Sequence, residues 1–367
     1  MTVPGDALAQ YCHPSNDPAT MRRHVPSATG ATRTTSDTDA VLMQTRQLGN
    51  LWPVSRLTLG GGGLGQLWGR TDRAEAVATV HAAVEGGITL FDLAPIYGRG
   101  ESEAVIGAAF EGRAPAGVRF TTKCQLGTPA AGQASSVIRQ HLERSLAALR
   151  LPRVDLLLLH SNIIPDGFRF PRDAPVQNRF ATPVSMYRDE VIPTFRALMR
   201  EGLIGNWGIT GVGLPDTIIE ALRGEPKPAV VQCVANCLDS AGGMRRYDEP
   251  ARPREIIAAA RRAGVGVLGI RAVQAGALTD QLDRELAQDD PERRDFVRAA
   301  PLRALARSLG VTTAKLAHRY ALSMDGVDSV ILGVKNRVEL KECLDAEAEG
   351  SLNVELVRQI DELVGRR

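Results

Sequence analysis

The strongest constraint on the fold is a repeated pattern in which a short apolar run stops at one polar side chain. Such runs cover residues 87–91, 118–122 and 154–159, and they end at Asp92, Lys123 and His160. These endpoints lie 31 and 37 positions apart, and apolar residues at helical spacing occupy each interval. Strand-like runs alternating with helical segments are typical of a parallel β/α fold.

Further strand-like runs at 203–210, 228–234, 265–270 and 327–332, with one before Gly60, bring the count to eight. The pattern therefore predicts a (β/α)8 TIM barrel of the α/β class. In such a barrel the carboxyl ends of the strands meet at one rim, where barrel enzymes place their catalytic groups. Asp92, Lys123 and His160 should then converge there, together with Tyr97, which follows Asp92 by five residues.

These four side chains suggest proton-transfer chemistry. A free tyrosine has a pKa of about 10, and an adjacent Lys123 ammonium is expected to lower the pKa of Tyr97 by stabilising the phenolate. Asp92 would hold Lys123 charged and in place, while His160 would orient a substrate oxygen. Taken singly, three of them have an ordinary structural explanation: Asp92 as a turn cap, Lys123 as a solvated strand end and His160 as a hydrogen-bonded core histidine. Their joint occurrence at this spacing favours catalysis.

The string GITLFDLAPIYGRGESE at 87–103, with Lys123 and His160 in order behind it, resembles the aldo-keto reductases. The resemblance extends from about Arg46 to the last helix. It implies a barrel that reduces an aldehyde or ketone with a nicotinamide cofactor and uses Tyr97 as the proton donor. Residues 1–45, rich in Thr, Ser, Ala, Pro and Asp, are expected to be a disordered extension, and residues 46–367 the barrel.

The same resemblance implies where the cofactor would bind. The implied cofactor-binding residues are Thr210 and Gln232 at the nicotinamide, Arg271 at the end of strand seven, and Gly333, Lys335 and Arg337 after strand eight. Gly211 replaces the asparagine that is usual in the family, and Ile270 replaces the usual aromatic ring.

Lys335 and Arg337 are able to pair with a 2′-phosphate, or to be no more than charges on a solvated loop. Glu339 stands where many NADP-dependent relatives have arginine and argues against a phosphate. We expect a modest preference for NADPH, with NAD possible.

Composition excludes several other classes. With 367 residues, 44% hydrophobic content and a net charge of +2, the chain can bury a full core and has no charge bias toward nucleic acid or membranes. No run of 18 apolar residues exists to span a membrane. Five irregularly spaced cysteines, with Cys233 and Cys237 lacking further ligands nearby, predict neither disulfides nor a metal site. We expect a cytoplasmic enzyme with a small carbonyl substrate.

A different class of function stays open: a nucleotide-binding, redox-sensing barrel similar to the potassium-channel β-subunits, although the four intact polar groups favour catalysis.

The sequence also makes predictions about three of the segments that connect strands and helices. The glycines at 60–63 and 65 are expected to form a loop close to a ligand, and the charged segment 279–301 a solvated excursion. The long connection 161–183, with its phenylalanines and arginines, is expected to form a lid over the substrate.

Overall fold

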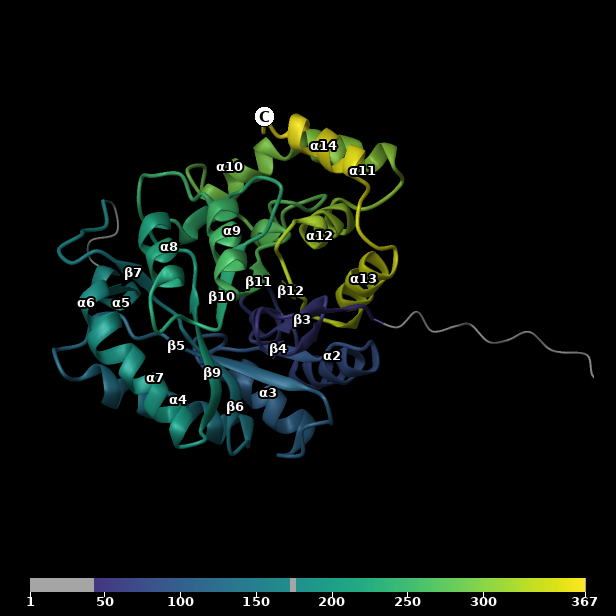
Figure 1. Ribbon diagram of the computed structural model, residues 1–367. Coiled ribbons are helices and arrows are strands. Elements are labelled where there is room, and N and C mark those ends of the chain that lie inside the picture. The colour runs from purple at the N-terminus through teal and green to yellow at the C-terminus, as the bar shows by residue number, and fades with distance from the viewer. Residues whose placement is uncertain (1–42, 172–175, 367) are drawn as a thin grey trace, which may run out of the picture. The chain divides into compact units, whose positions relative to one another are not determined.

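Eight parallel strands form a closed barrel in the computed structural model, which describes residues 43–171 and 176–366 (Figure 1). The strands are β3 (Leu57–Gly60), β4 (Leu90–Asp92), β5 (Arg119–Cys124), β6 (Val154–Leu159), β9 (Ile204–Thr210), β10 (Val230–Val234), β11 (Gly266–Ile270) and β12 (Ser329–Leu332). The ring closes where β12 pairs with β3. The predicted (β/α)8 barrel is confirmed.

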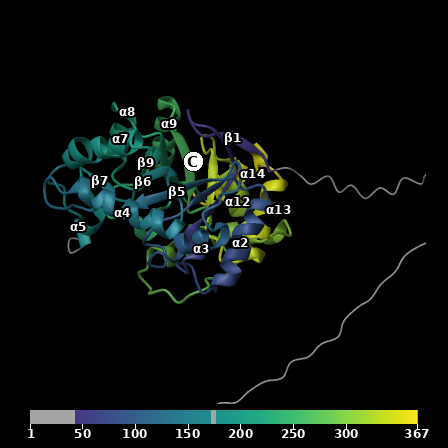
Figure 2. The ribbon, with the colours of Figure 1, turned by 90° about the horizontal axis from the view of Figure 1, so that it is seen from below.

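Helices surround the strands (Figures 1 and 2). They are α2 (Arg73–Glu85), α3 (Glu101–Phe110), α4 (Ala134–Leu149), α7 (Ile192–Arg200), α8 (Pro215–Arg223), α9 (Pro253–Ala263), α12 (Thr313–Ser323) and α13 (Arg337–Ala348). Local sequence explains their bounds: α2 begins after Asp72, whose side chain accepts a hydrogen bond from the Glu75 amide. In α4, the buried residues Ile138, Leu142 and Leu149 recur at helical spacing and face the barrel.

Strand alternation decides which side chains point into the barrel. Leu90 belongs to the small cluster that fills the barrel interior, whereas Phe91 packs among the residues beneath the helices. Asp92 therefore points inward, above Leu90. On β5, Thr122 likewise faces outward to Glu103 of α3, so Lys123 faces inward. The same alternation that builds the core thus places two charged groups inside the rim.

A hairpin of β1 (Thr45–Gln47) and β2 (Pro53–Ser55) precedes the barrel. Its residues Leu48 and Val54 pack with Leu90 and Leu268 of the barrel interior. The hairpin begins at Thr45, the last residue assigned to the predicted extension. Residues 1–42 lie outside the described residues, so their predicted disorder stays a prediction.

The glycine-rich segment forms a one-turn helix, α1 (Gly61–Leu64), and not the predicted open loop. Glycine is required here because a Cβ on Gly63 would lie 1.9 Å from the Val334 carbonyl oxygen. The loop after β12 therefore packs directly on α1.

Segment 279–301 is only partly solvated. It contains α10 (Pro291–Arg298), from which Asp295 is buried and accepts hydrogen bonds from Gln274 and Ser240. The many charged residues of this segment suggested solvent exposure, but the Asp295 carboxylate has hydrogen-bond partners inside the fold. Beyond α10, α11 (Ala300–Ser308) leads to α12, and α14 (Val354–Leu363) is the last helix of the chain that the structure describes.

The connection 161–183 is more structured than predicted. It contains β7 (Asn162–Ile164), the short helix α5 (Gln177–Phe180) and β8 (Ala181–Pro183), with β7 and β8 paired, and residues 172–175 lie outside the described residues. The next helical stretch contains α6 (Val184–Met186), a π-helical turn over Tyr187–Val191 and α7. Within the described ranges, no helix is long and apolar enough to cross a membrane.

Candidate active site

Lys123 is the centre of the site, and its ammonium group is fully buried. Its Nζ donates to Asp92 Oδ2 at 2.6 Å, to the Leu93 carbonyl oxygen at 3.0 Å and to the Tyr97 hydroxyl at 3.3 Å. The ammonium group thereby uses all three of its N–H donors. Burial alone would lower the pKa of Lys123, but the facing Asp92 and Tyr97 outweigh it and raise that pKa above its usual value. The ammonium is therefore held charged beside the phenol.

Asp92 is itself fixed from two sides. Its Oδ1 accepts a hydrogen bond from Thr121 Oγ1 at 2.7 Å and another from Gln232 Nε2 at 2.6 Å. Thr121 lies opposite Asp92 in the parallel register of β4 and β5, whereas Gln232 reaches it from β10. Both carboxylate oxygens are thus satisfied, which positions Asp92 to orient Lys123.

Tyr97 sits on the turn after β4 with its hydroxyl directed at Lys123. Burial of the phenol raises the pKa of Tyr97, and the Lys123 charge offsets this rise only in part. The expected lowering of the Tyr97 pKa is therefore wrong for the free protein, because desolvation of a phenolate outweighs one neighbouring cation. The hydroxyl remains protonated, as a proton donor must be.

His160 follows β6 and faces Tyr97, with 6.0 Å between the ring centroids. Burial, reinforced by the nearby Lys123 charge, lowers the pKa of His160 to about 3, so its imidazole is neutral near pH 7. Its Nδ1 is buried and has no hydrogen-bond partner among the described residues. A neutral imidazole carries one N–H group, which it can donate to a ligand.

The two residues implied at the nicotinamide lie side by side, since Thr210 and Gln232 are paired in register on β9 and β10. Thr210 Oγ1 donates to the carbonyl oxygens of Leu159 at 3.2 Å and Ser161 at 3.4 Å. Near these atoms, Asn162 Oδ1 is buried without a hydrogen-bond partner in the described part of the chain. Together with the orphaned His160 Nδ1, it marks this rim as fitted to a polar ligand such as a nicotinamide group.

Arg271, at the end of β11, makes its side-chain contacts with Glu292 and Gln274. Its guanidinium is almost fully buried and donates to Glu292 Oε1 at 2.5 Å and to Gln274 Oε1 at 2.7 Å. The chain adopts a positive φ of 61° at this residue, which turns it away from the direction of β11. Arg271 therefore links the end of β11 to α10, and its implied cofactor contact stays a prediction.

Lys335 and Arg337 lie after β12 as expected, but carboxylates already contact both. Lys335 Nζ pairs with Glu339 Oε1 at 2.7 Å and Asp283 Oδ2 at 3.3 Å, and Arg337 binds Glu75 through two nitrogens. Gly333 lies close to the indole of Trp68, because a Cβ there would meet Trp68 Nε1 at 3.2 Å. The two cations expected to favour NADPH thus already have carboxylate partners.

Sequence reasoning missed Thr121, Asn162 and Trp68 at the rim. Thr121 carried a usable signal, because strand alternation places it two residues before Lys123 on the same face as the interior groups. Trp68 reaches this rim through its contact with the distant Gly333, for which the local sequence holds no signal.

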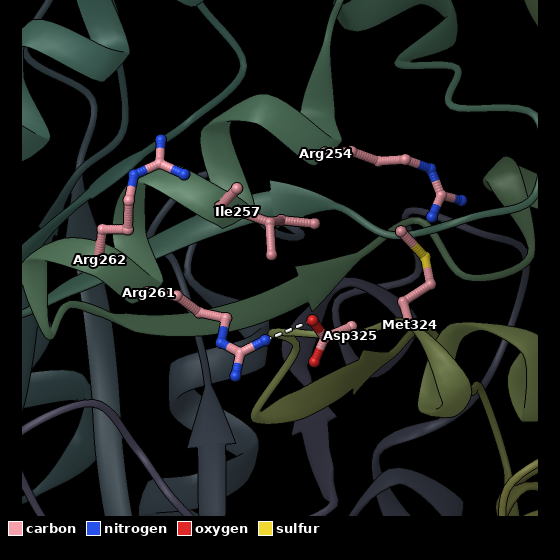
Figure 3. A pocket seen from close by; sticks show the side chains of 7 residues that line it. Arg254, Ile257, Arg261, Arg262, Met324 and Asp325 are labelled. Atoms are coloured by element: carbon pink, nitrogen blue, oxygen red, sulfur yellow. Dashed lines mark hydrogen bonds and ion pairs between the residues drawn. The ribbon is translucent and has the colours of Figure 1, made fainter.

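A groove of about 520 Å³ lies elsewhere, along α9 (Figure 3). It is lined by Arg254, Ile257, Ala258, Arg261, Arg262, Met324 and Asp325, and Arg261 is paired with Asp325 across it. None of the four convergent side chains lines this groove, so it is distinct from the candidate active site. Among the described residues, no cluster of three His, Cys, Asp or Glu side chains is arranged to hold a metal ion.

Comparison with known proteins agrees with the geometry. The model of the aldo/keto reductase family matches residues 56–364. An L-galactose dehydrogenase of Arabidopsis thaliana is 27% identical over 310 residues, which cover 84% of this chain and 89% of the relative. An uncharacterised oxidoreductase of Bacillus subtilis is 25% identical over 335 residues, covering 87% of this chain and 95% of the relative.

Two solved structures share the fold. An aldo-keto reductase of Bacillus halodurans, in its holo form, superposes with a TM-score of 0.65 at 23% identity, covering 88% of this chain and 96% of that one. A glycerol dehydrogenase of Gluconobacter oxydans gives a TM-score of 0.64 at 22% identity, covering 89% of this chain and 95% of that one. At this identity the likeness shows the barrel fold alone.

Proposed function

The chain belongs to the aldo/keto reductase family, and on that premise we propose that it reduces an aldehyde or ketone to an alcohol, with Tyr97 as the proton donor. The observation that carries the proposal is the contact of the buried Lys123 ammonium with both Asp92 and the Tyr97 hydroxyl. A charged lysine in this place stabilises the phenolate that remains when the proton leaves. Its oxidoreductase relatives support the same class of reaction.

The protein groups have separate tasks in this reaction. His160 donates a hydrogen bond from Nε2 to the carbonyl oxygen of the substrate and orients it beside Tyr97. Tyr97 gives its hydroxyl proton to that oxygen, and Lys123 compensates the phenolate charge while Asp92 keeps the lysine in place. A bound nicotinamide dinucleotide supplies the hydride that the carbonyl carbon receives. Thr210, Gln232 and Gly333, which lie around the same rim, are proposed to hold that group.

The described parts of the long connection, residues 161–171 and 176–183, are proposed to form a wall of the substrate site. Thr128 donates from its amide to the Asn178 carbonyl at 2.8 Å and from Oγ1 to the Ala181 carbonyl at 2.5 Å, while Thr182 Oγ1 donates to the Gly127 carbonyl. These bonds fasten its second half to the loop after β5, directly beyond Lys123. These bonds support a fixed wall in place of the lid predicted from the sequence.

The experiment that tests the function measures oxidation of NADH and of NADPH by the purified protein over a panel of aldehydes, ketones and sugars. Carbonyl-dependent oxidation within one substrate class supports the proposal. Tight coenzyme binding with no turnover on any carbonyl compound would instead favour the nucleotide-sensing function.

A further inference from the structure

Ion pairs fill the loops that follow the last two barrel strands, and from them we propose that this chain binds NAD(H) in preference to NADP(H). The inference rests on the proposed function, since it specifies which nicotinamide dinucleotide the site accepts. The two coenzymes differ by one phosphate on the 2′-oxygen of the adenosine ribose. The question is therefore what that phosphate would meet.

Phosphate sites in (β/α)8 barrels are frequently built from the loops after strands seven and eight and the N-terminus of a nearby helix. Here those strands are β11 and β12. The segment after β11 contributes Asp283, and the loop after β12 contributes Lys335 and leads into α13. These are the residues that a ribose phosphate would reach.

Carboxylates already lie at the N-terminus of α13, one of them from the same helix. The Glu339 amide donates to Asn336 Oδ1 at 2.9 Å, and Glu339 Oε2 accepts from the Lys335 amide at 2.9 Å. Its other oxygen, Oε1, pairs with Lys335 Nζ at 2.7 Å. A helix N-terminus favours a negative group, and Glu339 supplies that group from within the chain.

Lys335 is also held on its other side. Its Nζ contacts Asp283 Oδ2 at 3.3 Å, and its stem lies against Gly69, where an added Cβ would meet Lys335 Cδ at 3.1 Å. The lysine side chain is only 20% exposed. It therefore has little freedom to leave two carboxylates and follow a phosphate.

Arg337 has a partner of its own. Its amide and Nε donate to Glu75 Oε1 at 2.9 and 3.2 Å, and its NH2 group donates to Oε2 at 2.9 Å. This pair is more exposed than that of Lys335, with 58% of the arginine side chain accessible. A phosphate that recruited Arg337 would still be brought close to Glu75.

The charges of this cluster balance before any ligand binds. Arg284, which contacts Asp283, joins Lys335 and Arg337 as the third cation against Glu339, Asp283 and Glu75. A phosphate monoester adds about −1.5 to −2 charges near pH 7 and would leave the cluster negative. A ribose hydroxyl adds no charge and can donate to a carboxylate, which is how acidic residues recognise NAD in other dinucleotide sites.

The test is a pair of fluorescence titrations of the full-length protein with NADH and with NADPH, together with calorimetry of 5′-ADP against 2′,5′-ADP. Neither measurement needs turnover. We expect NADH and 5′-ADP to bind at least about tenfold more tightly than their 2′-phosphorylated counterparts, about 1.4 kcal/mol. Equal or tighter binding of NADPH overturns the inference and leaves the reductase proposal intact. Binding of neither coenzyme overturns both.

Two variants locate the effect. Glu339→Gln keeps the hydrogen-bonding shape but removes one charge, and Asp283→Asn does the same outside helix α13. Each should shift the preference toward NADPH by about tenfold, an amount typical of one altered charge contact. Glu342→Gln is the matched control, because Glu342 lies on α13 but bonds to Thr312. A shift as large in Glu342→Gln, or none in the other two variants, would contradict the assignment.

Discussion

Gln232 and Asp92, which are 140 residues apart in the chain, are joined by a 2.6 Å hydrogen bond from Nε2 to Oδ1 inside the barrel. β10 and β4 are not neighbours in the barrel, so this bond spans its interior. Gln232 was predicted to contact the coenzyme. Among the described residues its Oε1 has no protein partner and is available for that contact, while its Nε2 binds the carboxylate that fixes Lys123.

Replacing this glutamine should therefore affect coenzyme binding and turnover together. Gln232→Leu leaves Asp92 Oδ1 with Thr121 alone and should lower kcat about tenfold, in addition to weakening coenzyme binding, since a hydrogen bond to a charged group contributes about 1.5–3 kcal/mol. Steady-state kinetics and a coenzyme titration measure the two effects. Weakened coenzyme binding with an unchanged kcat would show that Gln232 contributes to coenzyme binding and not to the positioning of Asp92.

Lys123→Met should cost stability as well as activity. The substitution leaves Asp92 buried without its cation, and breaking a buried ion pair from one side typically costs about 3–5 kcal/mol. Adding Asp92→Asn should restore most of this loss, without restoring activity, because it removes the unpaired charge. Chemical denaturation of the two variants compares them. A double variant no more stable than Lys123→Met would show that the pair is not the source of the loss.

The pH dependence of carbonyl reduction should show no histidine titration. His160, with a pKa of about 3, stays neutral from about pH 5 upward, and Tyr97, with its raised pKa, stays protonated to about pH 9. We therefore expect a level kcat/KM between those limits. An inflection between about pH 6 and 7 that is absent from His160→Asn would contradict a neutral imidazole.

The lowered pKa of His160 also makes the stability of the folded state depend on pH. Since the unfolded histidine binds a proton at about pH 6.5 and the folded one only at about 3, the folded state loses stability as pH falls through this window. His160→Asn should reduce that loss.

The wall formed by the connection 161–183 should affect substrate and not coenzyme. Thr128→Val removes the hydroxyl that binds the Ala181 carbonyl and should raise KM for the best substrate several-fold while the coenzyme Kd stays constant. Ser136→Ala, at an exposed hydroxyl that bonds only within its own helical turn, is the control. An unchanged KM in Thr128→Val would contradict the proposal that this connection forms part of the substrate site.

The catalytic group was predictable because three of its members lie at or directly after strand ends and Tyr97 follows Asp92 by five residues, and strand ends are a property of local sequence. Asp92, Lys123 and His160 each follow an apolar run, and parallel strands bring such ends together. The cofactor group was harder to predict. Arg271 and Lys335 looked available in sequence, yet their carboxylate partners Glu292 and Asp283 come from a charged segment that local periodicity treats as solvated.

The pKa of Tyr97 is a second property of the site that could not be predicted from the sequence. The lysine that lowers it was visible in the sequence, but the burial that raises it depends on how closely the surrounding chain packs around the phenol. The direction of the shift is a balance of the two and is set by the tertiary structure.

The central claim, that Tyr97 donates the proton in carbonyl reduction, is tested most directly by Tyr97→Phe. The measurement is carbonyl-dependent oxidation of the reduced coenzyme by the variant and the wild type on the best substrate of the panel, with a parallel coenzyme titration. We expect kcat to fall by about 10²-fold to 10⁴-fold, the usual contribution of a general acid, while coenzyme binding stays within a few-fold. Turnover near that of the wild type, with coenzyme binding intact, would contradict the claim.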